Sequence, residues 1–489
     1  MPNYPSNLTL LPYEFALSNR VLVCPGQGEL LHTSTIENWV INEISRCNNG
    51  DLSLVKVNDE SFDKLLSELY QEQQSSSEVV MAGIKNFVDL EEAAAELEES
   101  ADLLDSENDA PIIRLLNSIL AEALKEHASD IHIETYEKQA VVRFRLDGVL
   151  RKVLSPSVQI APFLISRIKV MSRLDIAEKR LPQDGRMAVK LGGRSIDLRV
   201  STMPSSYGER VVMRLLDKDA GQMQTEDLGM PAETKGRLEE LIQRPHGIIL
   251  VTGPTGSGKT TTLYAALQQM NRQERNIMTV EDPVEYDLPG ISQTQINIRA
   301  GMTFAKGLRA ILRQDPDVIL IGEIRDKETA EIATQASLTG HLVLSTLHTN
   351  TASGAVTRLQ DIGVDSFLLA STIRGIVAQR LLRKLCQHCR QEVSCTEFQS
   401  KLMEVEQDTL IYQAVGCQHC NNTGFNGRRA LFELVEIDTE LQNLIHEDAG
   451  EIALEAAVRR KTPSIKNAGL EQVKLGATTI EEVLRVTSL

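Results

Sequence analysis

Apolar residues recur at helical spacing in some stretches of the chain and at strand spacing in others, and this pattern divides the chain into parts. Between residues 110 and 220, a helix is predicted over Ile112–His127, where apolar side chains return every three or four positions. A second helix is predicted over Gln159–Leu174. Short runs bounded by turn residues at Asp147-Gly148 and Gly192-Gly193 predict strands at Asp130–Glu134, Ala140–Leu146, Val149–Leu154, Arg186–Lys190, Ser195–Ser201 and Val211–Leu216. This part is therefore predicted to be an α+β domain.

The pattern changes from residue 247 onward, where strands and helices are predicted to alternate. Apolar runs predict buried strands at Ile248–Val251, Asn276–Glu281, Asp317–Glu323 and His341–Leu347. Helices are predicted between these strands, at Thr260–Met270, Phe304–Leu312 and Lys327–Leu338. Such alternation is typical of an α/β domain with a parallel sheet, and the residues after Arg429 are predicted to be mainly helical.

The start of the chain predicts a small mixed α/β domain followed by a polar connection. A strand is predicted at Val21–Val23, with helices at Ser34–Arg46 and Phe62–Tyr70. Gln71–Glu78 is polar, and residues 89–109 hold ten acidic residues and no basic one, which is typical of a linker. We therefore expect an N-terminal domain (1–70), a linker (71–109), a basic α+β domain (110–220), an α/β core (221–385), a cysteine subdomain (386–428) and a helical C-terminal subdomain (429–489).

Composition and charge limit the class of protein. The 489 residues are 42% hydrophobic and 24% charged, as in ordinary globular domains. No apolar run approaches the roughly 18 residues of a membrane-spanning helix, and the N-terminus lacks a signal-peptide pattern, so we expect a cytoplasmic protein. The net charge of −17 argues against a protein that coats nucleic acid, although residues 141–214 hold 15 Lys and Arg against six Asp and Glu.

The stretch after the strand Ile248–Val251 has the spacing of a phosphate-binding loop, G-x-x-x-x-G-K-[ST]. Its glycines let successive N–H groups point into one concavity, and the following helix adds its positive N-terminal end. Lys259 can then reach the β- and γ-phosphates, and Thr260 can offer its hydroxyl to Mg²⁺. The predicted nucleotide-binding residues are Gly253, Pro254, Thr255, Gly256, Ser257, Gly258, Lys259, Thr260 and Thr261.

Two predicted strands end in carboxylates that suit a magnesium–nucleotide site. Glu323 ends a strand that we place next to the phosphate loop, where it can hold the Mg²⁺ water shell or polarise the attacking water. Glu281 and Asp282 can do the same from the neighbouring strand. The identity of the base stays open between Glu281 and Glu323, of which we favour Glu323.

Four cysteines form two pairs with the spacing of metal ligands. Cys386-x-x-Cys389 and Cys417-x-x-Cys420 are separated by 27 residues, and two such pairs supply the four thiolates of a structural zinc site. Iron in a rubredoxin-like site is the alternative. Cys395, between the pairs, is predicted to be a spare thiol.

With these residues in view, the chain resembles the secretion and type IV pilus family of ATPases. Four motifs match this family in order: the phosphate loop, Thr279–Glu285, Ile319–Arg325 and Thr339–His348. Three further segments are also similar to the family: Ala128–Glu134, Leu181–Arg186 and Thr478–Thr487. Leu11–Ala16 followed by Val21–Val23 resembles the start of the type II secretion branch, the general secretion pathway E proteins.

The resemblance implies a RecA-like ATPase core, a PAS-like α+β domain and a ring of six identical subunits. Arg199 and Arg214 match the family's nucleotide-facing arginines, which act on a neighbouring subunit's site, and Arg143, Arg145 and Arg186 are weaker candidates. A solvated basic face that binds anionic lipid or the acidic linker is the alternative for these arginines. His348 matches a residue that senses the γ-phosphate.

The resemblance further implies a motor that hydrolyses ATP to drive pseudopilus assembly and protein export, at the cytoplasmic face of the inner membrane. Residues 1 to about 80 are expected to bind the inner-membrane component L, with component F as a further partner. One alternative is a type IV pilus assembly ATPase, which the short N-terminal region disfavours. A nucleic-acid motor is disfavoured by the net negative charge and by the lack of a surface where aromatic and basic residues mix. A scaffold that binds nucleotide without hydrolysing it is disfavoured by the two acids placed at strand ends, Glu281 and Glu323.

Overall fold

The structure is a computed structural model that describes residues 111–191, 194–216, 225, 227–270 and 274–488, together with scattered positions between residues 16 and 65. It divides into two compact units, Met1–Lys218 and Asp219–Leu489. The predicted linker over residues 71–109, the turn at Gly192-Gly193 and most positions of the two N-terminal helices lie outside the described residues. Among the described helices, none combines the length and the apolar character that crossing a bilayer requires.

The described N-terminal residues include a three-stranded sheet in the order β1-β2-β3. β1 (Val21–Cys24) pairs antiparallel with β2 (Glu29–His32), and β2 pairs parallel with β3 (Ser53–Lys56). The predicted strand at Val21–Val23 is therefore confirmed, and its three side chains are buried.

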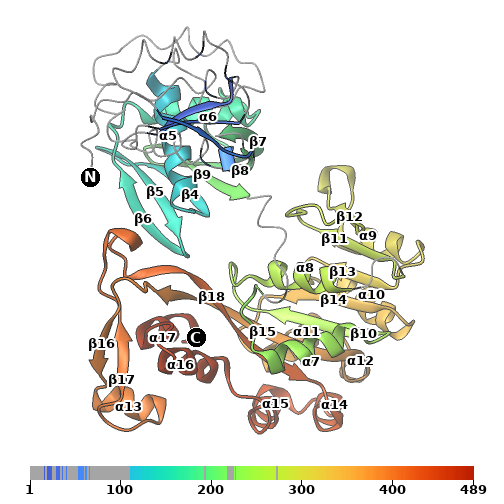
Figure 1. Cartoon of the computed structure of the whole chain (residues 1–489). Coiled ribbons are helices and arrows are strands. Elements are labelled where there is room, and N and C mark those ends of the chain that lie inside the picture. The colour runs from blue at the N-terminus through green and yellow to red at the C-terminus, as the bar shows by residue number, and fades with distance from the viewer. Residues whose placement is uncertain are drawn as a thin grey trace. The chain divides into compact units, whose positions relative to one another are not determined.

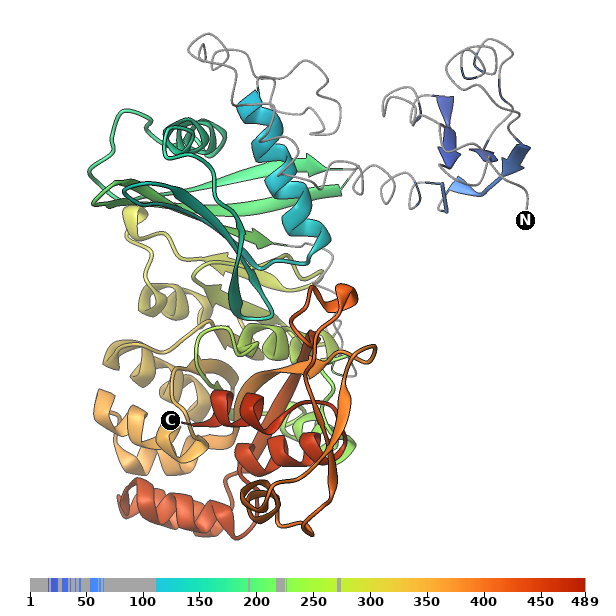
Figure 2. The same cartoon turned by 90° about the vertical axis from the view of Figure 1, so that its left-hand side faces the viewer.

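A six-stranded antiparallel sheet follows in the first unit, in the order β6-β5-β4-β9-β8-β7. Its strands are β4 (Asp130–Thr135), β5 (Ala140–Leu146), β6 (Val149–Leu154), β7 (Gln183–Leu191), β8 (Arg194–Ser205) and β9 (Gly208–Leu216). The two helices α5 (Pro111–Lys125) and α6 (Ala161–Met171) lie on one face of this sheet, as both views show (Figures 1 and 2). The predicted strands are confirmed, whereas α6 is shorter than predicted, and β9 lies in the middle of the sheet beside β4.

The second unit is built on a seven-stranded sheet in the order β12-β11-β13-β14-β10-β15-β18. Five strands continue the predicted parallel pattern: β10 (Gly247–Thr252), β11 (Ile277–Glu281), β12 (Ser292–Gln295), β13 (Val318–Ile321) and β14 (Leu342–Leu347). β15 (Ile373–Leu385) pairs parallel with β10, and β18 (Phe425–Glu436) pairs antiparallel with β15. The parallel sheet predicted from the alternating pattern is confirmed, with one antiparallel strand at its edge.

Helices cover both faces of this sheet, which explains why its strands are apolar without alternation. α7 (Ala232–Ile242) and α8 (Lys259–Gln269) share one core with Ile249 and Val251 of β10. Ile248 and Leu250, which point the other way, share a second core with α9 (Phe304–Ile311), α10 (Lys327–Leu338), α11 (Ala352–Ile362) and α12 (Ser366–Thr372). The phosphate loop therefore leaves a strand that is buried on both sides.

The structure corrects one expectation about this unit. β14 lies between β13 and β10, so the strand before Glu323 is not next to the phosphate-loop strand. The mainly helical segment predicted after Arg429 is confirmed, but it begins at Thr439, because the residues just after Arg429 continue β18 and pair along β15. Their side chains from Ala430 to Val435 are buried, as a strand covered on both faces requires.

The chain between β15 and β18 forms the cysteine subdomain, and the chain after β18 is helical. The subdomain contains β16 (Gln391–Ser394), α13 (Glu397–Met403) and β17 (Leu410–Gln413), with a 3₁₀ turn at Gln418–Cys420. The helices that follow are α14 (Thr439–His446), α15 (Gly450–Arg459), α16 (Ile465–Lys474) and α17 (Ile480–Thr487). α17 packs against β15, in part through an ion pair of the buried Glu482 with Arg383 of β15. Glu482 also pairs with Arg485 within α17.

Candidate functional site

The phosphate loop joins the end of β10 to the start of α8. Gly253, Gly256 and Gly258 have positive φ angles of 151°, 80° and 85°, which only glycine adopts easily. A Cβ atom at Gly253 would lie 2.4 Å from the backbone carbonyl oxygen of Gln379. A Cβ atom at Gly258 would lie 2.9 Å from the side-chain amide nitrogen of Gln379. The glycines therefore serve both the curl of the loop and its close contact with β15. The other predicted loop residues are exposed (Pro254, Thr255 and Thr260), partly buried (Thr261) or buried (Ser257 and Lys259).

Lys259 is folded back into the loop, and its ammonium donates only to carbonyl groups in the described structure. Its Nζ lies 2.7 Å from the carbonyl oxygen of Gly253 and 3.1 Å from that of Pro254. Burial lowers the pKa of Lys259 to about 8, the carboxylate of Glu323 opposes this shift, and the charge of Arg380 adds to it. The buried hydroxyl of Ser257 has no hydrogen-bond partner among the described residues. The loop thus holds a cation and a hydroxyl that a phosphate group could satisfy.

Glu323 lies two residues beyond β13, at the edge of the sheet where the parallel strands end. Its carboxylate pairs with Arg325, and the other oxygen lies 3.5 Å from Nε2 of His348, the residue that follows β14. Burial lowers the pKa of His348, and the charge of Lys259 adds to this shift. The charge of Glu323 acts on the pKa of Lys259, and the charges of Lys259 and Glu323 act on the pKa of His348. The three side chains therefore interact electrostatically, although β14 lies between β10 and β13.

Glu281 ends β11 and is buried in a network of neutral donors. Its carboxylate accepts hydrogen bonds from the hydroxyls of Tyr264 and Thr279 and, at 3.2 Å, from the amide of Gln293. Asp282, the next residue, is exposed. Glu281 and Asp282 therefore differ, because the oxygens of Glu281 already accept hydrogen bonds from three side chains. The sequence analysis assigned a role to none of these three side chains.

The sequence analysis also missed Gln379 and Arg380, which lie on β15 behind the phosphate loop. The Gln379 amide accepts a hydrogen bond from Thr262 of α8 at 2.8 Å. Both residues are buried, and they interrupt the apolar run of β15. Two polar residues in the middle of a buried strand are the signal that could have found them.

The predicted arginines of the first unit lie in register across its sheet. Pairing places Arg186, Arg199, Arg214, Asp130 and Arg145 opposite one another on β7, β8, β9, β4 and β5. Directly opposed residues point to the same face, so this row lies on the face away from the apolar core. The buried Asp130 accepts from Nε of Arg214 at 3.0 Å and lies 3.2 Å from Nε of Arg145.

A second cluster lies on the same face, at His132 and Glu134, two and four positions beyond Asp130 along β4. Glu134 lies 2.6 Å from Arg143 and 3.0 Å from Arg210, and the ring of His132 lies 3.1 Å from Arg210. Burial opposes ionisation of Glu134, but hydrogen bonds from Arg143 and Tyr136 prevail and lower its pKa. The five predicted arginines thus share a face with two buried carboxylates, and the sequence analysis did not single out Arg210.

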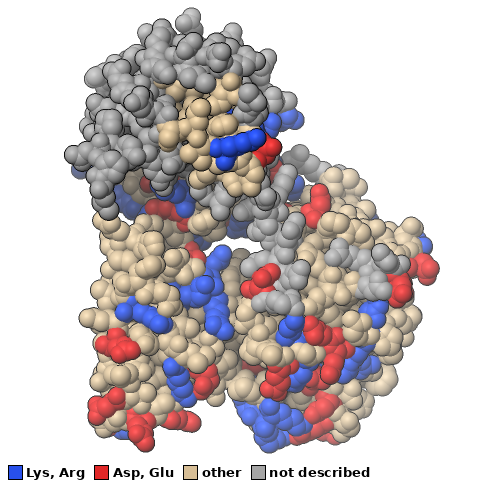
Figure 3. Space-filling model, viewed as in Figure 1, with Lys and Arg blue, Asp and Glu red and all other residues tan. Residues whose placement is uncertain are grey.

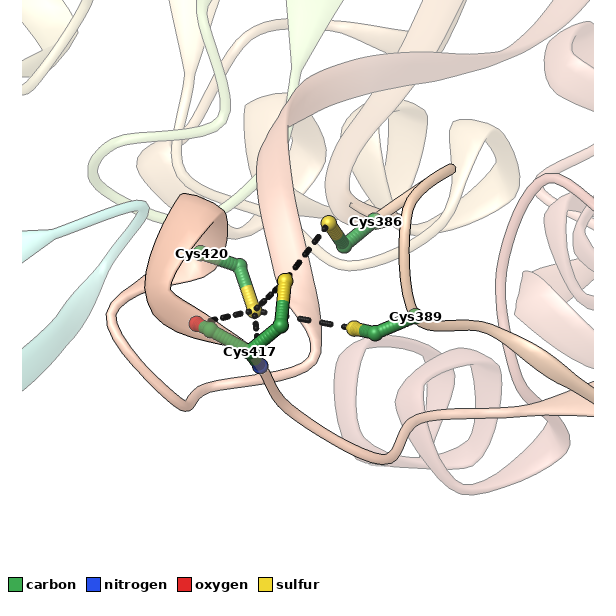
Figure 4. A group of neighbouring side chains, drawn as sticks. All are labelled: Cys386, Cys389, Cys417 and Cys420. Atoms are coloured by element: carbon green, nitrogen blue, oxygen red, sulfur yellow. Dashed lines mark hydrogen bonds between the residues drawn. The ribbon is translucent and has the colours of Figure 1, made fainter.

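The four predicted metal ligands converge on one point (Figure 4). Their sulfur atoms lie within 4.8 Å of one another, with Sγ–Sγ distances of 3.9 Å for Cys386 and Cys417 and 3.7 Å for Cys389 and Cys420. Four thiolates around one zinc ion, each at about 2.3 Å, are separated by about 3.8 Å, so the cluster fits a tetrahedral metal. Burial opposes ionisation of Cys420, but hydrogen bonds from the backbone N–H groups of Cys417 and Gly424 prevail and lower its pKa to about 6, whereas burial raises the pKa of Cys389.

Comparison with known proteins tests the resemblance. The family described as Type II/IV secretion system protein matches residues 105–485, and the N-terminal domain of GSPII protein E matches residues 10–70. The chain belongs to the type II secretion ATPase family. It is therefore an ATPase, and its family implies that it uses a nucleotide with Mg²⁺. The family and branch predicted from the motifs are confirmed.

Several relatives and solved structures are similar over most of their length. The type II secretion system protein E of Aeromonas hydrophila is 53% identical over 99% of this chain and 97% of the relative. The type II secretion system ATPase E of Vibrio cholerae is 53% identical over 94% of this chain and 92% of the relative. The solved structure of the pilus retraction motor PilT with bound ADP is 28% identical, with a TM-score of 0.53 over 76% of this chain and 96% of that one. The predicted P-loop fold class is confirmed.

Proposed function

We propose that this ATPase is the motor of a type II secretion system, and that it drives pseudopilus assembly and protein export across the outer membrane. The match of residues 10–70 to the N-terminal domain of GSPII protein E supports this branch over pilus assembly. The net charge of −17 disfavours a nucleic-acid motor. On the visible face of residues 227–488, basic side chains are interspersed with acidic ones (Figure 3), which also disfavours a track for a polyanion.

The observation that carries the proposal is the meeting of Lys259, Glu323 and His348 at one edge of the core sheet. Lys259 would leave its carbonyl partners and bind the β- and γ-phosphates, while the loop N–H groups and the start of α8 stabilise their charge. Thr260 and Asp282 would hold Mg²⁺, which when bound neutralises charge on the phosphate oxygens. His348 would sense the γ-phosphate.

Glu323 is our choice for the residue that orients and deprotonates the attacking water. Its carboxylate is only 12% exposed, yet its partners are an exposed arginine and a half-exposed histidine, both of which can move away. Glu281 would instead hold α8 and β12 in place through Tyr264 and Gln293. The sequence-based preference for Glu323 thus gains a structural reason.

Arg199 and Arg214 are proposed to complete the site of a neighbouring subunit in a ring of six identical chains. Mixing inactive Lys259→Ala with inactive Arg214→Ala should then restore some hydrolysis, since an intact site forms wherever the two chains meet correctly. Phosphate release measured over a range of mixing ratios tests this expectation. Absence of rescue at every ratio would favour a solvated basic face over trans-acting arginines.

Zinc is the metal that we propose for the four cysteines, with iron as the chemical alternative. Metal analysis of the purified chain should give one zinc per chain, and Cys417→Ser should lose it and destabilise residues 386–428. Cys395→Ser is the matched control, because Cys395 lies in a separate apolar cluster with Met403 and Ile411. Full zinc content in the Cys417→Ser variant would contradict the assignment.

The N-terminal domain is proposed to place the motor at the cytoplasmic face of the inner membrane by binding component L, with component F as a further partner. We also propose the domain division given above, in which residues 71–109 link this domain to the rest. A chain that begins near residue 100 should hydrolyse ATP but stay in the soluble fraction when co-expressed with component L. Recruitment of that shortened chain to the membrane as efficiently as the full chain would show that the anchor lies elsewhere.

A further inference from the structure

Arg380 on β15 is a buried cation whose hydrogen bonds all go to neutral groups in the described structure. The residue is 4% exposed. Its guanidinium donates to the carbonyl oxygens of Gln379 at 3.0 Å, Asn350 at 2.9 Å and Val486 at 3.1 Å, and it also contacts the side-chain oxygen of Asn350 at 3.2 Å. Among the described residues, it forms no ion pair with a carboxylate. Burial lowers the pKa of Arg380 and the more distant charge of Glu433 opposes this shift, but an arginine keeps its charge at neutral pH.

The position of Arg380 relative to the phosphate loop follows from strand pairing. β15 runs parallel to β10, with Ala378 opposite Thr252, so Gln379 and Arg380 lie beside the first residues of the loop. A Cβ atom at Gly253 would lie 3.3 Å from a terminal nitrogen of Arg380. The guanidinium therefore lies close to Gly253, the first residue of the loop.

The partners of Arg380 come from two other segments that are distant in sequence. Asn350 lies two residues after His348, and Val486 belongs to α17, near the C-terminus. The guanidinium thus joins the phosphate loop, the segment that follows His348 and the end of the last helix. The sequence analysis assigned no site residue to the C-terminal segment, and this contact gives that segment a connection to the predicted nucleotide site.

A buried cation without a paired counter-ion is unfavourable unless something else compensates for its charge. The polyphosphate of a nucleotide carries that compensating charge, and a triphosphate carries more of it than a diphosphate. We propose that Arg380 is a positioning residue that senses nucleotide charge: it favours triphosphate over diphosphate through the loop, and its hydrogen bonds transmit occupancy to the end of α17. The inference rests on the proposed function in one respect, namely that nucleotide binds at residues 253–260.

Three variants of the full chain separate the charge of Arg380 from its hydrogen bonds. Arg380→Gln removes the charge, whereas Arg380→Lys keeps a cation but cannot reach both Asn350 and Val486. Arg383→Gln is the matched control, because Arg383 also ties β15 to α17, through Glu482 at 2.8 Å, without contacting the loop. Calorimetry with Mg²⁺ and either ADP or β,γ-imido-ATP gives the two affinities, and hydrogen exchange gives the protection of residues 480–488.

Arg380→Gln should bind the triphosphate analogue about tenfold more weakly and ADP less so, which lowers the affinity ratio. Arg380→Lys should keep the ratio but lose the nucleotide-dependent protection of α17. Arg383→Gln should lower the melting temperature yet keep the ratio. Melting curves of all variants verify that each is folded.

Equal weakening of both nucleotides in folded Arg380→Gln would overturn the inference. Should Arg380→Gln fail to fold, Arg380→Lys decides, because retained protection of α17 in that variant contradicts the role of the hydrogen bonds. Failure of the proposed function is recognised separately. It would appear as normal nucleotide binding by Lys259→Ala. If Lys259→Ala does not bind nucleotide and Arg380→Gln keeps the affinity ratio of triphosphate to diphosphate, only this inference is overturned.

Discussion

Two buried lysines in the two units of this chain illustrate opposite ways of accommodating a charge. Lys169 of α6 is 1% exposed, and its ammonium lies 2.5 Å from Glu209 of β9 while also donating to the carbonyl oxygen of Glu178 at 2.8 Å. Lys259 of the phosphate loop is 8% exposed, yet its described partners are only the carbonyl oxygens of Gly253 and Pro254. One charge is paired with a carboxylate within the fold, and the other rests on neutral carbonyl groups.

The difference shows which buried charges hold a fold together and which serve function. Removing one member of a buried ion pair destabilises the fold, because it leaves an isolated charge in a medium of low dielectric constant. A cation that rests on carbonyl groups costs stability in the free protein and regains it when an anion binds. Arg380 follows the pattern of Lys259, and Glu482, held by Arg383 and Arg485, follows that of Lys169.

Lys259→Ala should produce the largest effect, a loss of ATP hydrolysis of at least about a thousandfold, because its charge meets the transferring phosphoryl group. Its unfolding free energy should change by less than about 1 kcal/mol, since the partners left behind are neutral carbonyl groups and no buried charge loses its counter-ion. Steady-state phosphate release and thermal melting measure the two quantities. A melting temperature that falls as far as that of a Lys169 variant would remove the distinction between the two lysines.

Lys169→Met should act in the opposite way, by destabilising the first unit by about 3–5 kcal/mol, because Glu209 is then buried without a partner. Denaturant unfolding, followed by hydrogen exchange in α6 and β9, measures this loss for the unit concerned. The double variant Lys169→Met with Glu209→Gln is the control, and it should recover most of the loss. If the single variant is as stable as the natural chain, pairing does not distinguish the two lysines.

The contrast between these lysines shows where sequence-based prediction ends. The spacing from Gly253 to Thr260 predicted the loop, because few other folds require that series of glycines before a helix. The place of β14 between β10 and β13 was not predicted, because strand order depends on long-range crossovers that no local pattern records. The same holds for the contact between Arg380 and Val486, which are 106 residues apart.

The two carboxylates show the reverse of the lysines: the one proposed to act in catalysis is paired with a charge, and the one proposed to be structural is not. Glu281 is buried with only neutral donors, whereas Glu323 is paired with Arg325. Solvent weakens the pairing of Glu323 with the exposed Arg325, so the carboxylate of Glu323 stays available to the attacking water. We therefore expect Glu323→Gln to keep nucleotide binding and to lose turnover by about a hundredfold, because the proposed base is removed. Glu281→Gln should mainly lower the melting temperature. Normal turnover in Glu323→Gln with loss of turnover in Glu281→Gln would contradict our choice of Glu323 as the base. It would also mean that, in the acids as in the lysines, the buried group without a charged partner is the one that acts in catalysis.

The smallest effect is expected at Asp130, where a paired cation is also proposed to act on nucleotide. Nε of Arg214 donates to Asp130 at 3.0 Å, and the arginine side chain is 56% exposed, so its terminal nitrogens extend toward solvent. Asp130→Asn keeps the shape and an acceptor oxygen but removes the charge that orients Arg214. Hydrolysis by the assembled protein should therefore fall about tenfold, through kcat rather than KM if Arg214 acts only in the transition state.

Glu126→Gln is the matched control for Asp130→Asn, because Glu126 is a carboxylate of the first unit that also pairs with an arginine, Arg151, although it is less buried than Asp130. Its effect should be limited to stability, with kcat unchanged. Equal losses of kcat in the two variants would indicate that pairing in this unit serves only folding, as it does for Lys169. A selective loss in Asp130→Asn would instead show that a charge held by a carboxylate can still act on a ligand when its guanidinium is oriented through Nε alone.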